Sequence, residues 1–133
     1  MEGWLNDEYL VLFSEAERSA LADRYGISAT LPGYVLVGLR GWDEFIVLNE
    51  VGGMLCMPTV PLDLEYAKPF ELPGSFDLIA DGRFSNKIKW YVKPLVFGGD
   101  VQDLDNMTWV SLTQHAELVV WWNAQYKLAS SDQ

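Results

Sequence analysis

His115 is the only histidine of this 133-residue chain and therefore its only conventional general base. It opens the stretch HAELVVWWN at residues 115–123. A catalytic histidine needs a nucleophile or an orienting carboxylate within hydrogen-bond reach, and the neighbouring sequence supplies no recognisable one. We therefore expect a packed histidine that donates a hydrogen bond to a backbone carbonyl. Catalysis with a carboxylate from elsewhere in the fold is the alternative.

A helix is predicted to position this histidine. Ser111-Leu112-Thr113-Gln114 has the form of a capping box, and a helix to about Tyr126 follows from it. The helical spacing places five residues on one stripe, namely Leu112, His115, Val119, Trp122 and Tyr126. The stripe predicts that His115 is buried. Its position in the first helical turn disfavours its charged form.

Trp121 lies about 100° from its neighbour Trp122 on this helix and so points toward the polar side. Both tryptophans cannot face the same core. We expect another segment of the chain to cover Trp121. The alternative is a half-exposed aromatic side chain that serves a protein interface.

Three aspartates, Asp100, Asp103 and Asp105, resemble a loose set of oxygen ligands for a hard cation. Their spacing lacks the pattern of an EF-hand, and no bidentate glutamate follows at the required distance. We expect a solvated acidic loop. No set of cysteines and histidines can hold zinc, and no glycine-rich phosphate loop is present, so the sequence predicts no metal and no cofactor.

A second candidate group, Trp42, Asp43 and Glu44, places one aromatic ring and two carboxylates at a predicted hairpin corner. One interpretation is a turn whose tryptophan folds back onto the sheet. The other is an anchor for a basic partner.

The formal net charge of -10 comes from 19 acidic and 9 basic residues. It disfavours nucleic acid and anionic membranes, and it favours a basic partner. The alternative is an acidic surface that only aids solubility. No apolar run could span a bilayer and no signal peptide opens the chain, so we expect a cytoplasmic protein. The single cysteine, Cys56, is expected to be a buried, inert thiol.

The element pattern predicts a single α+β domain over residues 1–133. A capping box at Ser14 starts a helix from Glu15 to Tyr25, with Gly26 at its end. An antiparallel meander follows, with strands at residues 34–39, 44–49 and 54–60, the last ending near Pro58. Residues 87–93 alternate and predict a further strand, with Ile88, Trp90 and Val92 on one face and lysines opposite. Residues 10–13 fit either a strand or a helical turn.

The order of these motifs resembles the core of the SUKH superfamily. The resemblance lies in Tyr25-Gly26-Ile27, Leu31-Pro32-Gly33-Tyr34, the Gly52-Gly53 turn and Val60-Pro61-Leu62, and it is strongest from about Glu15 to Asp63. The family contains fungal cell-wall-synthesis regulators of the Smi/Knr type and bacterial proteins regarded as immunity proteins that neutralise polymorphic toxins. The resemblance implies a compact α+β domain and no catalytic residues.

We therefore expect a non-enzymatic protein-binding domain that acts as a bacterial immunity protein and captures a basic toxin domain. The alternatives are a regulatory or scaffold protein of the Smi/Knr type and a small enzyme that uses His115. The candidate partner-binding residues are Trp42, Asp43, Glu44, Asp100, Asp103, Asp105 and Trp121.

Overall fold

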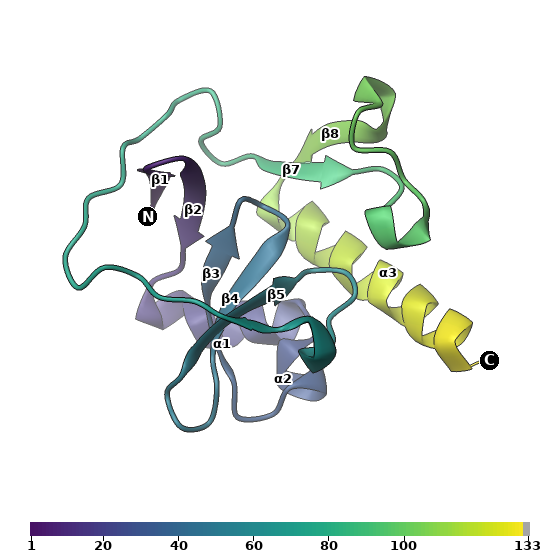
Figure 1. The fold of residues 1–133 in the computed structure, drawn as a ribbon, viewed down its shortest axis with the longest axis horizontal. Helices are drawn as coiled ribbons and strands as arrows, with labels where there is room; N and C mark the ends of the chain where they lie inside the picture. Colours follow the sequence, from purple (N-terminus) through teal and green to yellow (C-terminus); the bar gives the residue numbers. More distant parts are fainter. Residues whose placement is uncertain (132–133) are drawn as a thin grey trace.

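A six-stranded antiparallel sheet forms the centre of the computed structural model, which describes residues 1–131 (Figure 1). Its strands lie side by side in chain order. The predicted meander is confirmed and forms the third, fourth and fifth strands of the sheet. Of the undecided segment at residues 10–13, Leu10 to Leu12 belong to a strand and Phe13 follows it. The strands are β1 (Glu2–Leu5), β2 (Glu8–Leu12), β3 (Val35–Arg40), β4 (Glu44–Leu48), β5 (Met54–Pro58) and β6 (Lys68–Pro69).

Two helices cover one face of this sheet and lie behind it in Figure 1. They are α1 (Glu15–Arg24), as predicted, and the short α2 (Ile27–Thr30). The backbone N–H of Ser14 donates to Glu17 Oε1 at 3.0 Å, as the predicted capping box requires. Gly26 follows α1 with φ 77°, a left-handed conformation that glycine adopts at little cost.

The opposite face of the sheet is covered by the long irregular segment between β6 and the next strand. Leu10, Leu12, Val37 and Ile46 form a buried cluster on that face, and Phe70, Leu72, Phe76 and Leu78 pack against it. The central strands are therefore buried on both faces. This explains why they read as nearly continuous apolar runs rather than as alternating ones.

A two-stranded ribbon and the terminal helix complete the fold. β7 (Ile88–Tyr91) pairs with β8 (Met107–Val110), and α3 (Leu112–Ser131) follows directly. Between the two strands lie short 3-10 turns, η2 (Leu95–Phe97) and η3 (Leu104–Asn106), and a third, η1 (Leu64–Tyr66), precedes β6. In Figure 1 the ribbon lies above the central strands and α3 runs along its underside. No helix within residues 1–131 is long and apolar enough to span a bilayer.

The structure confirms the α+β fold, with corrections to its edges. β1, β6, β8 and α2 were not predicted, and α3 extends beyond Tyr126 to Ser131. Ile88 and Trp90 are buried as predicted, whereas Val92 is 53% exposed because β7 ends one residue earlier. The last two residues of the predicted domain, 132 and 133, lie outside the described part of the chain.

Candidate binding site

The turns of two neighbouring hairpins meet at one end of the sheet. β1 and β2 are joined at Asn6 and Asp7, and β3 and β4 are joined at residues 41–43. Arg40 lies between these turns, because its strand pairs with β2 on one side and β4 on the other. Its Nε donates to Glu8 Oε1 at 2.9 Å, and its Nη1 lies 3.7 Å from Glu44 Oε1. One guanidinium thus holds two carboxylates at the strand ends.

Five aromatic rings pack together beside these turns. Trp42 stacks on Tyr9 with ring centroids 4.8 Å apart, and it meets Trp4, Phe84 and Trp109 edge to face at 5.3 to 6.4 Å. The cluster combines rings from β1, β2, β8, the β3–β4 turn and the segment before β7. Edge-to-face and stacked rings stabilise a fold beyond the area they bury. Trp42 therefore folds back onto the protein, which agrees with the interpretation of a turn whose tryptophan packs against the sheet.

The backbone of Trp42 is in the left-handed region, with φ 66°, immediately after Gly41 with φ 59°. A bulky side chain rarely adopts this conformation, and it costs roughly 1–2 kcal/mol. The ring contacts of Trp42 offset this cost. Consequently the turn presents a half-buried indole and, directly after it, two carboxylates, those of Asp43 and Glu44.

A hollow of about 300 Å³ lies where the β3–β4 turn faces the β7–β8 ribbon. We call it the junction hollow. Trp42, Asp43 and Glu44 form one side of it, Pro58, Thr59 and Val60 follow from the end of β5, and β7 with the segment after it contributes Lys89, Trp90, Tyr91, Pro94 and Leu95. The hollow thus combines aromatic and aliphatic walls with two carboxylates and one ammonium group.

A second hollow of about 280 Å³ adjoins the first, because Trp42, Asp43 and Glu44 line both. We call it the turn hollow. Its other charged residues are Asp7, Glu8 and Arg40. Together the two hollows present four carboxylates and two cationic groups, and Arg40 is already paired with Glu8 and Glu44. The surface at this end of the sheet therefore carries an excess of negative charge.

Asp43 and Asp7 are the carboxylates of this surface without an ion pair, because within residues 1–131 no Lys, Arg or His nitrogen lies within ion-pair distance of either. Of the two, Asp43 lines both hollows. Desolvation, and after it the negative charge of Glu44, raises the pKa of the Asp43 carboxyl above its ordinary value. Its side chain nevertheless remains exposed, so solvent screening limits this shift. A cation placed beside Asp43 would find an uncompensated charge.

His115 lies behind the wall of the junction hollow and has no access to it. Its side chain is fully buried, and Trp90, which lines the hollow, meets its ring edge to face at 5.5 Å. The Tyr25 hydroxyl and His115 Nδ1 are hydrogen-bonded at 2.7 Å, so the expectation of a backbone carbonyl partner is wrong. Desolvation lowers the pKa of His115 to about 3, and the imidazole is neutral near pH 7. A substrate in solvent cannot reach it in this conformation.

The acidic loop is separate from the hairpin turns. Asp100 Oδ1 accepts a hydrogen bond from the Gln102 backbone, and Asp103 Oδ1 accepts one from the Asp105 backbone, at 2.8 and 3.0 Å. These bonds close local turns, and all three aspartates are exposed. Among the residues described here, no group of three or more His, Cys, Asp and Glu side chains could hold a metal ion. The three aspartates thus belong to an exposed loop whose local turns they close or border.

Trp121 is 54% exposed on the outer side of α3. The ring of Trp121 meets that of Trp122, with ring centroids 4.9 Å apart. Trp122 in turn contacts Phe97 of η2. The prediction that another segment covers Trp121 is therefore wrong. The ribbon and η2 pack on the Trp122 side of the helix and leave the adjacent face, 100° away, to solvent.

Two residues that shape the site were not singled out in the sequence. Asn123 of α3 donates from Nδ2 to the Thr59 carbonyl at 2.8 Å and accepts from the Leu62 backbone at 2.7 Å. It thereby fixes the segment that forms one wall of the junction hollow. Arg40 is the other, because it holds Glu8 and Glu44 in place. An isolated arginine between acidic residues at strand ends was the available signal for Arg40, whereas nothing in the sequence indicates the clamp by Asn123.

The buried position predicted for Cys56 is confirmed. Its side chain is 1% exposed, and Arg40 Nη1 donates to its sulfur at 3.3 Å. Desolvation by burial raises the pKa of the thiol above its ordinary value, so it is a poor nucleophile.

Comparison of this chain with protein-family models, with curated proteins and with solved structures found no match.

Proposed function

From this geometry, we propose that the chain is a non-catalytic protein-binding domain that captures a basic partner through the hairpin end of its sheet. The observation that carries the proposal is the pair of adjoining hollows, which are lined by four carboxylates and by aromatic rings, and in which Asp43 has no ion-pair partner within residues 1–131. Charged rims speed association and select partners of opposite charge, while aromatic side chains in a hollow supply contact area. A net charge of -10 extends the attraction beyond the site.

The resemblance to the SUKH superfamily suggests the class of partner. We propose that the partner is a basic toxin domain, of which this chain is the immunity protein. The buried, neutral state of His115 supports a binding role over the alternative in which that histidine performs catalysis. A regulatory or scaffold role of the Smi/Knr type would require a host complex as the partner.

The test is co-expression with a toxin domain encoded beside this gene, followed by affinity purification at low salt. We expect a stable complex whose dissociation constant rises steeply with salt concentration. Failure to recover a complex at low salt would contradict the immunity role. Recovery of a complex that is insensitive to salt would contradict the electrostatic basis of the proposal.

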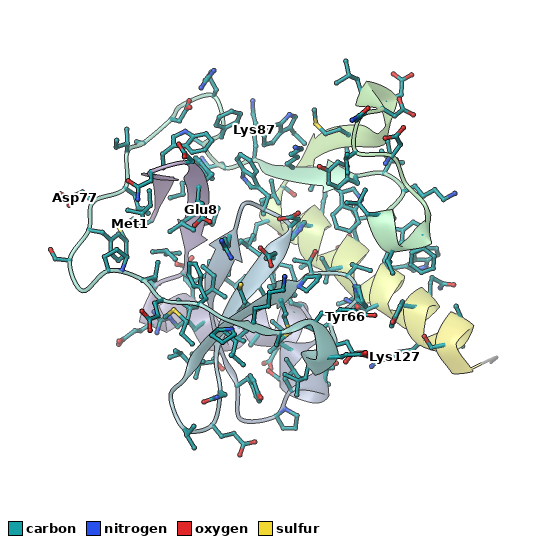
Figure 2. The ribbon with its side chains drawn as sticks, viewed as in Figure 1. Met1, Glu8, Tyr66, Asp77, Lys87 and Lys127 are labelled. Atoms are coloured by element: carbon teal, nitrogen blue, oxygen red, sulfur yellow. The ribbon has the colours of Figure 1, made fainter. Side chains whose placement is uncertain are left out.

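Charge-reversal variants locate the interface among the candidate residues. Asp43→Lys with Glu44→Lys alters the hairpin end, Asp105→Lys alters the acidic loop without removing a turn hydrogen bond, and Trp121→Ser alters the face of α3. We expect the first variant to reduce affinity most. Asp77→Lys is the matched control, because Asp77 is exposed at the outer edge of the long loop (Figure 2). If the Asp105 or Trp121 variant alone weakened the complex, the interface would lie elsewhere.

A further inference from the structure

The junction hollow is small for a ligand site and has room for a long side chain. Its volume of about 300 Å³ is at the lower end of the range of about 300–1,000 Å³ in which drug-sized ligands bind. Its apolar walls include Pro58, Val60 and Leu95, which suit a long aliphatic stem. The two carboxylates lie on one side, at the β3–β4 turn, and the one ammonium group, that of Lys89, comes from β7. An occupant that fits is apolar along its length and charged at its end.

The charge at the polar side is negative and incompletely compensated. Asp43 has no ion-pair partner within residues 1–131, and Glu44 receives only the longer contact, at 3.7 Å, of the shared Arg40 guanidinium. The turn hollow continues the acidic surface through Asp7 and Glu8. The charge of the junction hollow therefore favours a cation, and the acidic surface around it is complementary to a basic protein surface.

The protein itself shows how a cation sits in this hollow. Lys89 Nζ lies 5.3 Å from the centroid of the Tyr91 ring, and both residues line the hollow. This is an intramolecular cation–π contact. Lys89 is on β7 and faces Asp43 across the hollow, where its charge lowers the pKa of that carboxyl to a small extent. It does not reach ion-pair distance, so the hollow retains room and charge for a second cation that competes with Lys89.

We infer that the junction hollow receives an arginine side chain of the basic partner, with its guanidinium between the Asp43 and Glu44 carboxylates and the aromatic rings of Trp42 and Tyr91. Arginine fits better than lysine, because its planar guanidinium stacks on rings and binds carboxylates with two parallel hydrogen bonds. This inference rests on the proposed function, since it names the group by which that partner is recognised.

The test uses N-acetyl-arginine methylamide as the probe, titrated into the ¹⁵N-labelled protein and followed by NMR. The matched neutral probe is N-acetyl-citrulline methylamide. We expect saturable shifts at the Trp42 and Trp90 indole N–H signals and at Thr59, with a dissociation constant on the order of millimolar for so small a ligand. The citrulline probe is expected to cause no saturable shift. A third probe, N-acetyl-lysine methylamide, is expected to bind more weakly than the arginine probe.

Two variants of opposite sign make the inference falsifiable. Asp43→Asn is expected to weaken arginine binding by about fivefold, as for one partly exposed ion pair. Lys89→Gln is expected to strengthen it, because the competing cation is removed. The controls are Asp77→Asn and Lys87→Gln, which make the same charge changes at exposed positions labelled in Figure 2. Because salt screens distant charges, we expect both controls to bind the arginine probe within about twofold of the unmodified protein.

Three results would overturn the inference: equal shifts with arginine and citrulline, tighter binding of the lysine probe, or the same affinity in Asp43→Asn as in Asp77→Asn. These results are distinguishable from failure of the proposed function. If a toxin complex forms and Asp43→Asn leaves its affinity unchanged, the arginine site is contradicted and the binding role stands. If the arginine probe binds specifically but no toxin complex forms, the arginine site stands and the immunity role is contradicted.

Discussion

The Tyr25–His115 pair and the hairpin end of the sheet both place aromatic rings beside ionisable groups. The two regions differ in whether these groups are enclosed or open to solvent. In the buried pair, a titratable ring is enclosed by Tyr25, Trp90 and the helices, and it is hydrogen-bonded and neutral. At the hairpin end, Trp42 is half-buried beside the carboxylates of Asp43, which is exposed, and Glu44, which is partly exposed. Aromatic rings next to ionisable groups therefore occur both in the enclosed core and at an open surface of this protein, and burial distinguishes the two places.

The largest effect is expected for His115→Ala, which should lower the free energy of unfolding by about 3 kcal/mol. The change leaves a cavity at a fully buried position and removes the hydrogen-bond partner of the Tyr25 hydroxyl. Urea unfolding followed by far-UV circular dichroism measures it. The control is Tyr25→Phe, which leaves the ring and is expected to cost less. A loss below about 1 kcal/mol for His115→Ala would mean that the pair is not a stabilising core element.

The next effect is a pH dependence that belongs to the buried pair alone. The folded-state pKa of His115 is about 3 and its ordinary value is 6.5, so the unfolded chain binds a proton that the folded chain does not. This contribution to stability is complete above pH 6.5 and is lost as the pH falls toward 3. We expect a loss of up to about 1.4 kcal/mol per pH unit in that window.

Measurement of the unfolding free energy from about pH 7 to about pH 5 tests this dependence, with His115→Gln as the reference that removes the titration. The carboxylates contribute equally to both proteins, so the difference between the two curves isolates His115. Parallel curves would show that the imidazole titrates normally in the folded protein.

Trp42 tests how far the hairpin end is a packed structure as well as a surface. Trp42→Ala removes the contacts with four rings and is expected to cost about 2 kcal/mol, less than for a fully buried tryptophan. Trp42→Gly is expected to cost about 1 kcal/mol less than the alanine variant, because glycine accepts a φ of 66° without strain. Thermal unfolding of both variants measures the difference. A glycine variant less stable than the alanine variant would contradict the strained turn.

The smallest effect on stability is expected for Arg40→Gln. Its ion pairs with Glu8 and Glu44 are partly exposed, so we expect a loss below about 1 kcal/mol. The same change leaves both carboxylates uncompensated, so binding of the arginine probe should become stronger. Urea unfolding and the NMR titration give the two values. Weaker arginine binding in Arg40→Gln than in Lys87→Gln would contradict the electrostatic description of the hairpin end.

The parts of the fold that could be predicted are those fixed by local chemistry. Both capping boxes form, at Ser14 and at Ser111, where the backbone N–H donates to Gln114 Oε1 at 2.9 Å. The helix end at Gly26 and the strand end at Pro58 follow from the backbone properties of glycine and proline. Each of these signals acts over three or four residues, so no tertiary information was needed to read it.

The parts that could not be predicted depend on contacts between distant segments. Trp4 and Ile79 exchange backbone hydrogen bonds at 2.8 and 2.9 Å across 75 positions, and this contact ties the long loop to β1. The partner of His115 is Tyr25, 90 positions away, and the clamp by Asn123 reaches back to Thr59 and Leu62. Local periodicity carries no information on which distant backbone group will be adjacent.

The sequence by itself determined the α+β class, the central meander, the burial of His115 and Val119 on the last helix, and the acidic character of the protein. Only the tertiary structure decided which aromatic residues are enclosed. Trp121 and Trp122 are adjacent in sequence, yet η2 packs on one and leaves the other to solvent. Trp42 contacts rings from four other segments, while Asp43 beside it has no ion-pair partner within residues 1–131. The physical reason is that burial and charge compensation are properties of what packs against a residue, and that partner is chosen by the whole fold.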